Sequence, residues 1–124
     1  MKSLVLSFFI LCAGCFCSDD DEVSVICTTQ FVYGLQVAVT NASTNSEITD
    51  GIVVMATDDD YSEELVNHPN SDSFVGAGER PGNYIISVTG DQYESFITEV
   101  ISVEMDDEGC HVIPEIVNIS LVGI

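Results

Sequence analysis

The sequence predicts an all-β protein, a seven-stranded antiparallel Greek-key sandwich. Three observations predict it. Apolar residues alternate with other residues at a period of two in several segments, turn signals recur about every eight to twelve residues, and only one short segment could form a helical turn. A chain of 124 residues has room for one hydrophobic core, which we place in residues 29–124.

The first half of this domain begins with its clearest strand pattern. From Phe31 to Thr40 an apolar residue occupies every second position. An Asn-, Ser- and Thr-rich loop follows over 41–51. Residues 52–56 are a short β-branched run, which is typical of a strand buried on both faces. Residues 61–67 are expected to form one helical turn, which Pro69 would end.

The second half repeats strands and turns. Ser73 to Ala77 predicts a short strand, and Arg80 to Asn83 predicts a type II turn, because proline and glycine suit its central positions. Tyr84 to Val88 predicts the next strand. The apolar residues of Phe96 to Met105 change register, which indicates a bulge or a strand that is apolar on both faces. After a turn at 106–109 the last strand is expected over 110–122, with Pro114 at an edge or bulge.

The N-terminus has the layout of a secretory signal peptide over residues 1–14. Lys2 precedes an apolar run from Leu4 to Cys12, and small residues lead to Cys15. The run is too short to span a bilayer as a helix, which needs about 20 residues. Residues 11–15 (Leu-Cys-Ala-Gly-Cys) resemble a bacterial lipobox, so we expect Cys15 to be acylated. An ordinary signal peptide without an anchor is the alternative. Residues 15–28 are then a lipidated acidic tether.

The cysteines predict one disulfide. Cys12 leaves with the signal peptide and Cys15 is the acylation candidate, so three cysteines remain. We pair Cys27 with Cys110, because one directly precedes the first strand-like segment and the other the last, and Cys17 is left as a spare thiol. The bridge closes a loop of about 84 residues, worth about 4.5 kcal/mol in the chain-entropy model. Disulfides persist in oxidising compartments, which agrees with export.

The charge balance argues against negatively charged partners. Once Lys2 is removed, Arg80 is the only Lys or Arg against 21 Asp and Glu. Nucleic acid and anionic lipid head groups both require clustered cations, so neither is expected as a partner. The acidity serves solubility, for example in a saline medium, or binding of cations or basic partners.

Residues 77–88, Gly90 to Tyr93 and the triplet Cys110-His111-Val112 carry a resemblance to a known family. They look like the carboxypeptidase regulatory-like domains, which have a transthyretin-like (prealbumin-like) β-sandwich and are found on exported bacterial proteins. The resemblance covers residues 30–121. It implies a transthyretin-like topology and a non-catalytic structural or binding role. An immunoglobulin-like topology is the alternative for the predicted sandwich.

Catalytic motifs are not found. A zinc site or a His-based triad would need His68 and His111, the only histidines, and His68 lies in a polar loop. We expect His111 to be a packed or capping residue near Cys110. The chain ends Leu-Val-Gly-Ile with one arginine, unlike the 5-hydroxyisourate hydrolases of the same fold, and it has no Gly-x-Ser-x-Gly elbow. No catalytic residue and no cofactor is therefore predicted.

Calcium is the metal for which ligands are present. Two acidic runs place hard oxygen ligands in turns: Asp58, Asp59 and Asp60, and separately Asp106, Asp107 and Glu108. Neither run fits the twelve-residue EF-hand loop, so solvated turns are the alternative.

The sequence thus predicts a non-catalytic lipoprotein domain, tethered to a membrane by its lipid and located in the bacterial cell envelope, at the outer membrane or the surface. Its role is structural or the binding of an unidentified protein or glycan. The alternative is a small extracytoplasmic hydrolase with carboxylate or calcium-assisted chemistry, which requires a pocket that gathers two or more acids of raised pKa.

Overall fold

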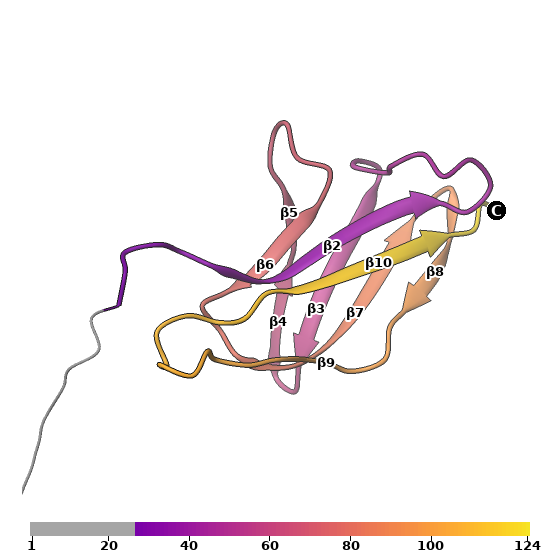
Figure 1. Cartoon of the computed structure of the whole chain (residues 1–124). Coiled ribbons are helices and arrows are strands. Elements are labelled where there is room, and N and C mark those ends of the chain that lie inside the picture. Colours follow the sequence, from indigo (N-terminus) through magenta and orange to yellow (C-terminus); the bar gives the residue numbers. More distant parts are fainter. Residues whose placement is uncertain (1–26) are drawn as a thin grey trace, which may run out of the picture.

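Alternating side chains place one face of each long strand against the core, and residues 27–124, which the computed structural model describes, accordingly form two β-sheets (Figure 1). No helix occurs in these residues, which confirms the predicted all-β class. None of them therefore forms a helix suited to crossing a membrane. The predicted signal peptide, the acylation candidate Cys15, Cys17 and the tether as far as residue 26 lie outside the described residues.

The first sheet has the strand order β10-β2-β6-β5. Its strands are β2 (Tyr33–Asn41), β5 (Val66–Asn67), β6 (Phe74–Gly78) and β10 (Glu115–Leu121). β6 is antiparallel to both β2 and β5, but β10 is parallel to β2, so the fully antiparallel prediction is wrong for this pair. The reason is that Cys27, ahead of β2, is bonded to Cys110, ahead of β10. Both strands therefore start at the same end of the sheet.

The second sheet has the order β4-β3-β7-β8, with β9 also paired to β7. Its strands are β3 (Ile52–Asp58), β4 (Tyr61–Glu64), β7 (Gly82–Gly90), β8 (Tyr93–Ile97) and β9 (Ile101–Val103). The expected irregularity lies between β8 and β9. There Thr98 donates its backbone N–H to Ile86 O at 2.9 Å and accepts from Ile86 N through its hydroxyl at 3.0 Å. The threonine side chain thus replaces one ladder bond.

Both sheets bury their inner faces in one hydrophobic cluster. Leu35, Val37 and Val39 of β2 and alternate residues of β7 are fully buried, as the alternation predicts. Burial on both faces of residues 52–56 is a wrong prediction, since Val53 is 41% exposed. Val53 lies on the outer face of the second sheet, opposite the face on which Val54 and Ala56 are buried.

One segment crosses between the sheets. Residues 61–67, expected to be helical, instead form β4 in the second sheet and β5 in the first. Leu65 donates its N–H to Val54 O at 2.8 Å, and the next residue, Val66, pairs with Val75. Leu65 is 2% exposed and packs over Gly76, where an added Cβ would collide with its Cδ2. Burial in this segment alternates from Tyr61 to Leu65, which is a strand period.

Two further boundaries differ from prediction. The turn expected at 80–83 lies earlier, because Arg80 donates its N–H to Ala77 O and Gly82 already begins β7. Ala77 and Glu79 carry the positive φ angles there, 53° and 50°. The last strand begins at Glu115, after Pro114, which cannot donate to the ladder.

The crossing at Leu65 gives a stability prediction. Leu65→Ala should lower the free energy of unfolding by about 2–5 kcal/mol, because a buried leucine that joins two sheets leaves a cavity. Chemical denaturation measures this. Val66→Ala is the matched control, since Val66 is 51% exposed and should lose much less. Equal losses at the two positions would contradict the crossing.

Candidate functional site

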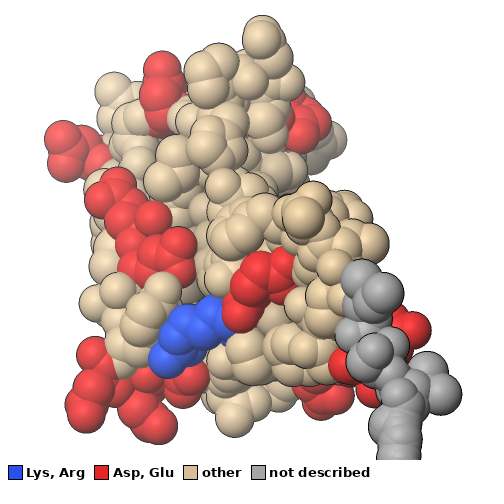
Figure 2. All heavy atoms as spheres, turned by 90° about the vertical axis from the view of Figure 1, so that its left-hand side faces the viewer, with Lys and Arg blue, Asp and Glu red and all other residues tan. Residues whose placement is uncertain are grey.

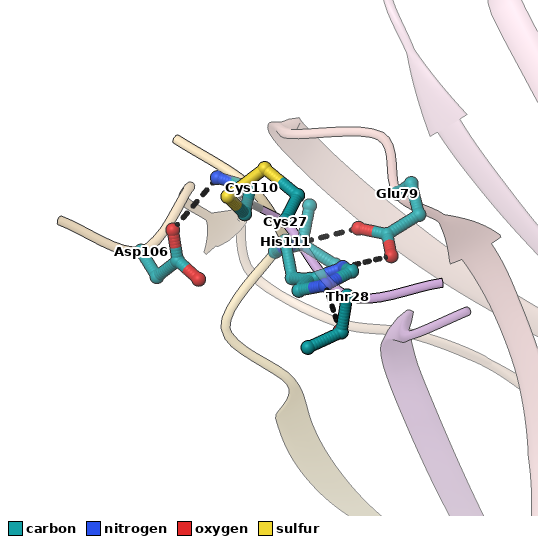
Figure 3. The surroundings of a disulfide bond; sticks show 7 residues. Cys27, Thr28, Glu79, Asp106, Cys110 and His111 are labelled. Atoms are coloured by element: carbon teal, nitrogen blue, oxygen red, sulfur yellow. Dashed lines mark hydrogen bonds and ion pairs between the residues drawn. A yellow bond between two sulfur atoms is a disulfide. The ribbon is translucent and has the colours of Figure 1, made fainter. Parts of the chain in front are cut away.

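The disulfide joins the residues ahead of β2 to a hairpin between β9 and β10. Cys27 and Cys110 are bonded with their Cα atoms 5.3 Å apart, which confirms the predicted pairing (Figure 3). The hairpin is closed by Ile113 N–H to Glu104 O and by Asp106 N–H to His111 O, both 2.8 Å. The bridge therefore fixes the N-terminal entry of the domain against this hairpin.

Glu79 binds the same two segments without covalent bonds. Its carboxylate accepts the N–H of Val32 at 3.0 Å and that of Val112 at 3.1 Å, so it contacts the entry to β2 and the hairpin together. It also accepts from His111 Nδ1 at 2.5 Å. The side chain reaches inward from the turn after β6, where Glu79 has the left-handed φ of 50°.

His111 links this carboxylate to a hydroxyl. Its Nε2 lies 2.8 Å from Thr28 Oγ1, and Figure 3 shows Glu79, the imidazole and Thr28 in succession beside the disulfide. The side chains of His111 and Glu79 are 17% and 24% exposed, whereas Thr28 is exposed. We call Glu79, His111 and Thr28 the carboxylate–imidazole–hydroxyl chain.

The hydrogen bonds set the charge of the nearby acids. Partial burial disfavours the charge of Glu79, but the bonds from His111, Val112 and Val32 outweigh it, and its pKa falls below the ordinary 4.5. Asp106 accepts the N–H of Cys110 at 3.0 Å, and this bond, despite partial burial, leads those that hold its pKa below 3.8. Both carboxyls are therefore ionised at neutral pH.

Arg80, the one Lys or Arg within the described residues, contacts three neighbouring side chains. Its Nη1 bonds Asp58 Oδ2 at 3.1 Å and Tyr84 Oη at 2.9 Å, and its guanidinium lies 3.6 Å from the centre of the Tyr61 ring. Tyr84 Oη donates in turn to Arg80 O at 2.8 Å. Figure 2 shows this cation with carboxylates around it. Arg80 is thus paired with a carboxylate of its own domain.

The calcium candidates are not brought together. Asp58 is paired with Arg80, and Asp59 occupies a turn with a φ of 53°. The Asp106 carboxylate accepts backbone N–H groups of its own hairpin. Over residues 27–124 no group of three or more His, Cys, Asp or Glu is placed to hold a metal ion.

Two open hollows lie at the other end of the sheets, beside the start of β3 and the end of β7. They measure about 450 and 310 Å³, and both are lined by Gly51 and Asp91. Asp50 joins Asp91 in the smaller one. Glu47, whose pKa is raised by its hydrogen bond and repulsion with Asp72, lines neither. The smaller hollow thus brings two carboxylates, Asp50 and Asp91, together at this end of the sheets.

Sequence reasoning missed two members of the carboxylate–imidazole–hydroxyl chain. It expected His111 to pack beside Cys110, but it placed neither Thr28 nor Glu79 beside this histidine. One signal was present: Thr28 follows Cys27 and His111 follows Cys110, so the predicted bridge places the two side chains near each other. Nothing in the sequence marks Glu79, because its approach depends on the turn after β6.

No protein-family model matches the sequence, and the search for similar curated proteins found no match.

The lowered pKa of Glu79 predicts acid sensitivity. A carboxyl whose pKa is depressed on folding stabilises the fold above its unfolded value, near 4.5, and this contribution is lost as the pH falls through the folded pKa. Glu79→Gln should therefore flatten the decline of the melting temperature below about pH 4.5. The exposed Glu99→Gln is the control. An unchanged pH profile in Glu79→Gln would contradict the role of this carboxylate.

Proposed function

We propose that this chain is a non-catalytic, exported lipoprotein domain that binds a partner or spaces one from the membrane. The observation that carries the proposal is the disulfide-fixed entry: the bond joins Cys27, near the end of the expected tether, to Cys110. A pull transmitted through the tether would meet a covalent bond to the hairpin before it reached β2. This arrangement suits a domain held by its N-terminus.

A seven-stranded Greek-key sandwich of transthyretin-like type is the architecture we propose. Strands β4 and β5 are separated by one residue, and β8 and β9 lie on the same side of β7. Counting each of these pairs as one interrupted strand gives seven. The strand orders and the shared hydrophobic cluster support this assignment, as does the resemblance in residues 77–88 and 110–112.

Export and anchoring rest on the signal-like N-terminus and on the disulfide. Disulfides form and persist mainly in oxidising compartments, which favours the cell envelope. We propose cleavage after residue 14, acylation of Cys15 and an acidic tether over 15–28. The tether holds the domain, residues 29–124, away from the membrane.

The outer face of the first sheet is the surface that suits a protein or glycan partner. Across its four strands, Ile116, Gln36, Val75 and Val66 lie in one row. Ile116 is 71% exposed. Strands β2, β5 and β6 contain no Asp or Glu, so this face differs from the acidic loops around it. A partner without positive charge can approach here with the least repulsion.

Replacement of the acylation candidate tests the anchor. In the native host, the wild-type protein should remain with the membrane after a high-salt wash, and its mature mass should include acyl groups and lack two hydrogens for the disulfide. Cys15→Ser should move the protein to the soluble fraction, because a lipid holds it rather than charge. Cys17→Ser is the matched control and should stay in the membrane fraction. Equal distribution of wild type and Cys15→Ser would overturn the proposed anchor.

A further inference from the structure

We propose that Thr28 is a nucleophile that accepts an acyl group, with His111 as its general base and Glu79 as the residue that positions the base. This goes beyond the non-catalytic role proposed above, because it gives the domain one covalent reaction. A nucleophile within hydrogen-bond reach of a base, with the base oriented by a third group, is the arrangement that activates a hydroxyl. The two separations are 2.8 Å and 2.5 Å.

The hydrogen-bond inventory determines the direction of proton transfer. An ionised carboxylate can only accept, so His111 Nδ1 must carry the proton that Glu79 receives. In a neutral imidazole the other nitrogen, Nε2, then has a free lone pair and accepts from Thr28 Oγ1. This tautomer is the one that a general base requires.

The surroundings hold the three groups in place. Backbone N–H groups of Val32 and Val112 fix the Glu79 carboxylate. The disulfide joins the residues directly before Thr28 and His111, so the hydroxyl and the base are fixed relative to each other by a covalent link. Such pre-organisation lowers the entropy cost of reaching the reactive geometry. The base is mostly shielded, while Thr28 is an exposed residue.

The reaction is a single acyl transfer. Thr28 Oγ1 forms a bond to the carbonyl carbon of an ester or thioester as its proton passes to His111 Nε2, and Glu79 stabilises the resulting imidazolium. The bond to the leaving oxygen or sulfur then breaks, and the leaving group takes the proton from Nε2. The products are an O-acyl threonine and a free alcohol or thiol. No oxidant, metal or cofactor takes part.

The substrate class follows from the open position of Thr28. The two hollows at the far end of the sheets contain none of the three side chains, so they do not hold the acyl donor for this reaction. The donor is therefore an activated ester or thioester whose carbonyl reaches an exposed hydroxyl, such as one presented on the surface of a bound partner. The result is one covalent attachment per chain.

The test treats the full exported protein with p-nitrophenyl acetate and locates the acetyl group by peptide mass mapping. Thr28 should react on the order of 100-fold faster than its exposed neighbour Thr29, which is the contribution expected of a general base. Thr28→Ser should keep the reaction and Thr28→Val should abolish it. His111→Gln and Glu79→Gln should lower acetylation at Thr28 while leaving it unchanged at Thr29.

Equal acetylation of Thr28 and Thr29 in the wild type would overturn the proposal, as would an unchanged rate at Thr28 in a folded His111→Gln variant. Melting curves recorded beside each rate show whether a variant is folded. Should His111→Gln unfold, the comparison of Thr28 with Thr29 in the wild type still decides.

Discussion

The shortage of cations is the constraint on which the rest of this structure depends. The described residues contain one Arg and no Lys, and that Arg is used within a cluster of Asp58, Tyr61 and Tyr84. Carboxylates that approach the core must therefore be satisfied by hydroxyl, imidazole and backbone N–H groups. Glu63 shows the pattern, since its Oε1 accepts from Ala77 N at 3.0 Å and from Tyr61 Oη at 2.7 Å. The hydrogen bond between Tyr61 and Glu63 is also the main cause of the raised pKa of Tyr61.

These carboxylates act where segments from different parts of the chain meet. Glu63 lies on β4 and contacts β6, so it supports the crossing between the two sheets. Glu79 joins the entry to β2 with the hairpin that precedes β10. The disulfide makes the same connection as Glu79 by a covalent bond. One end of the domain therefore depends on both the disulfide and the Glu79 carboxylate. The carboxylate–imidazole–hydroxyl chain forms beside the disulfide.

The sequence predicted those features that depend on a local period or on cysteine position. The alternation from Phe31 to Thr40 identified the core residues of β2, and the placement of Cys27 and Cys110 identified the disulfide. The prediction failed at residues 61–67. There a short strand changes sheets, and its alternating burial becomes visible only in the structure. The contacts of Glu79 were also beyond prediction, because they require three segments that are distant in sequence.

The most direct test of this account is an NMR titration of amide protons from pH 7 to about 2. If Glu79 binds both segments, the amide signals of Val32 and Val112 should shift together, with one midpoint below the ordinary carboxyl pKa of 4.5. Amides that titrate separately, or with a midpoint at or above 4.5, would contradict the claim that this carboxylate holds the entry and the hairpin together.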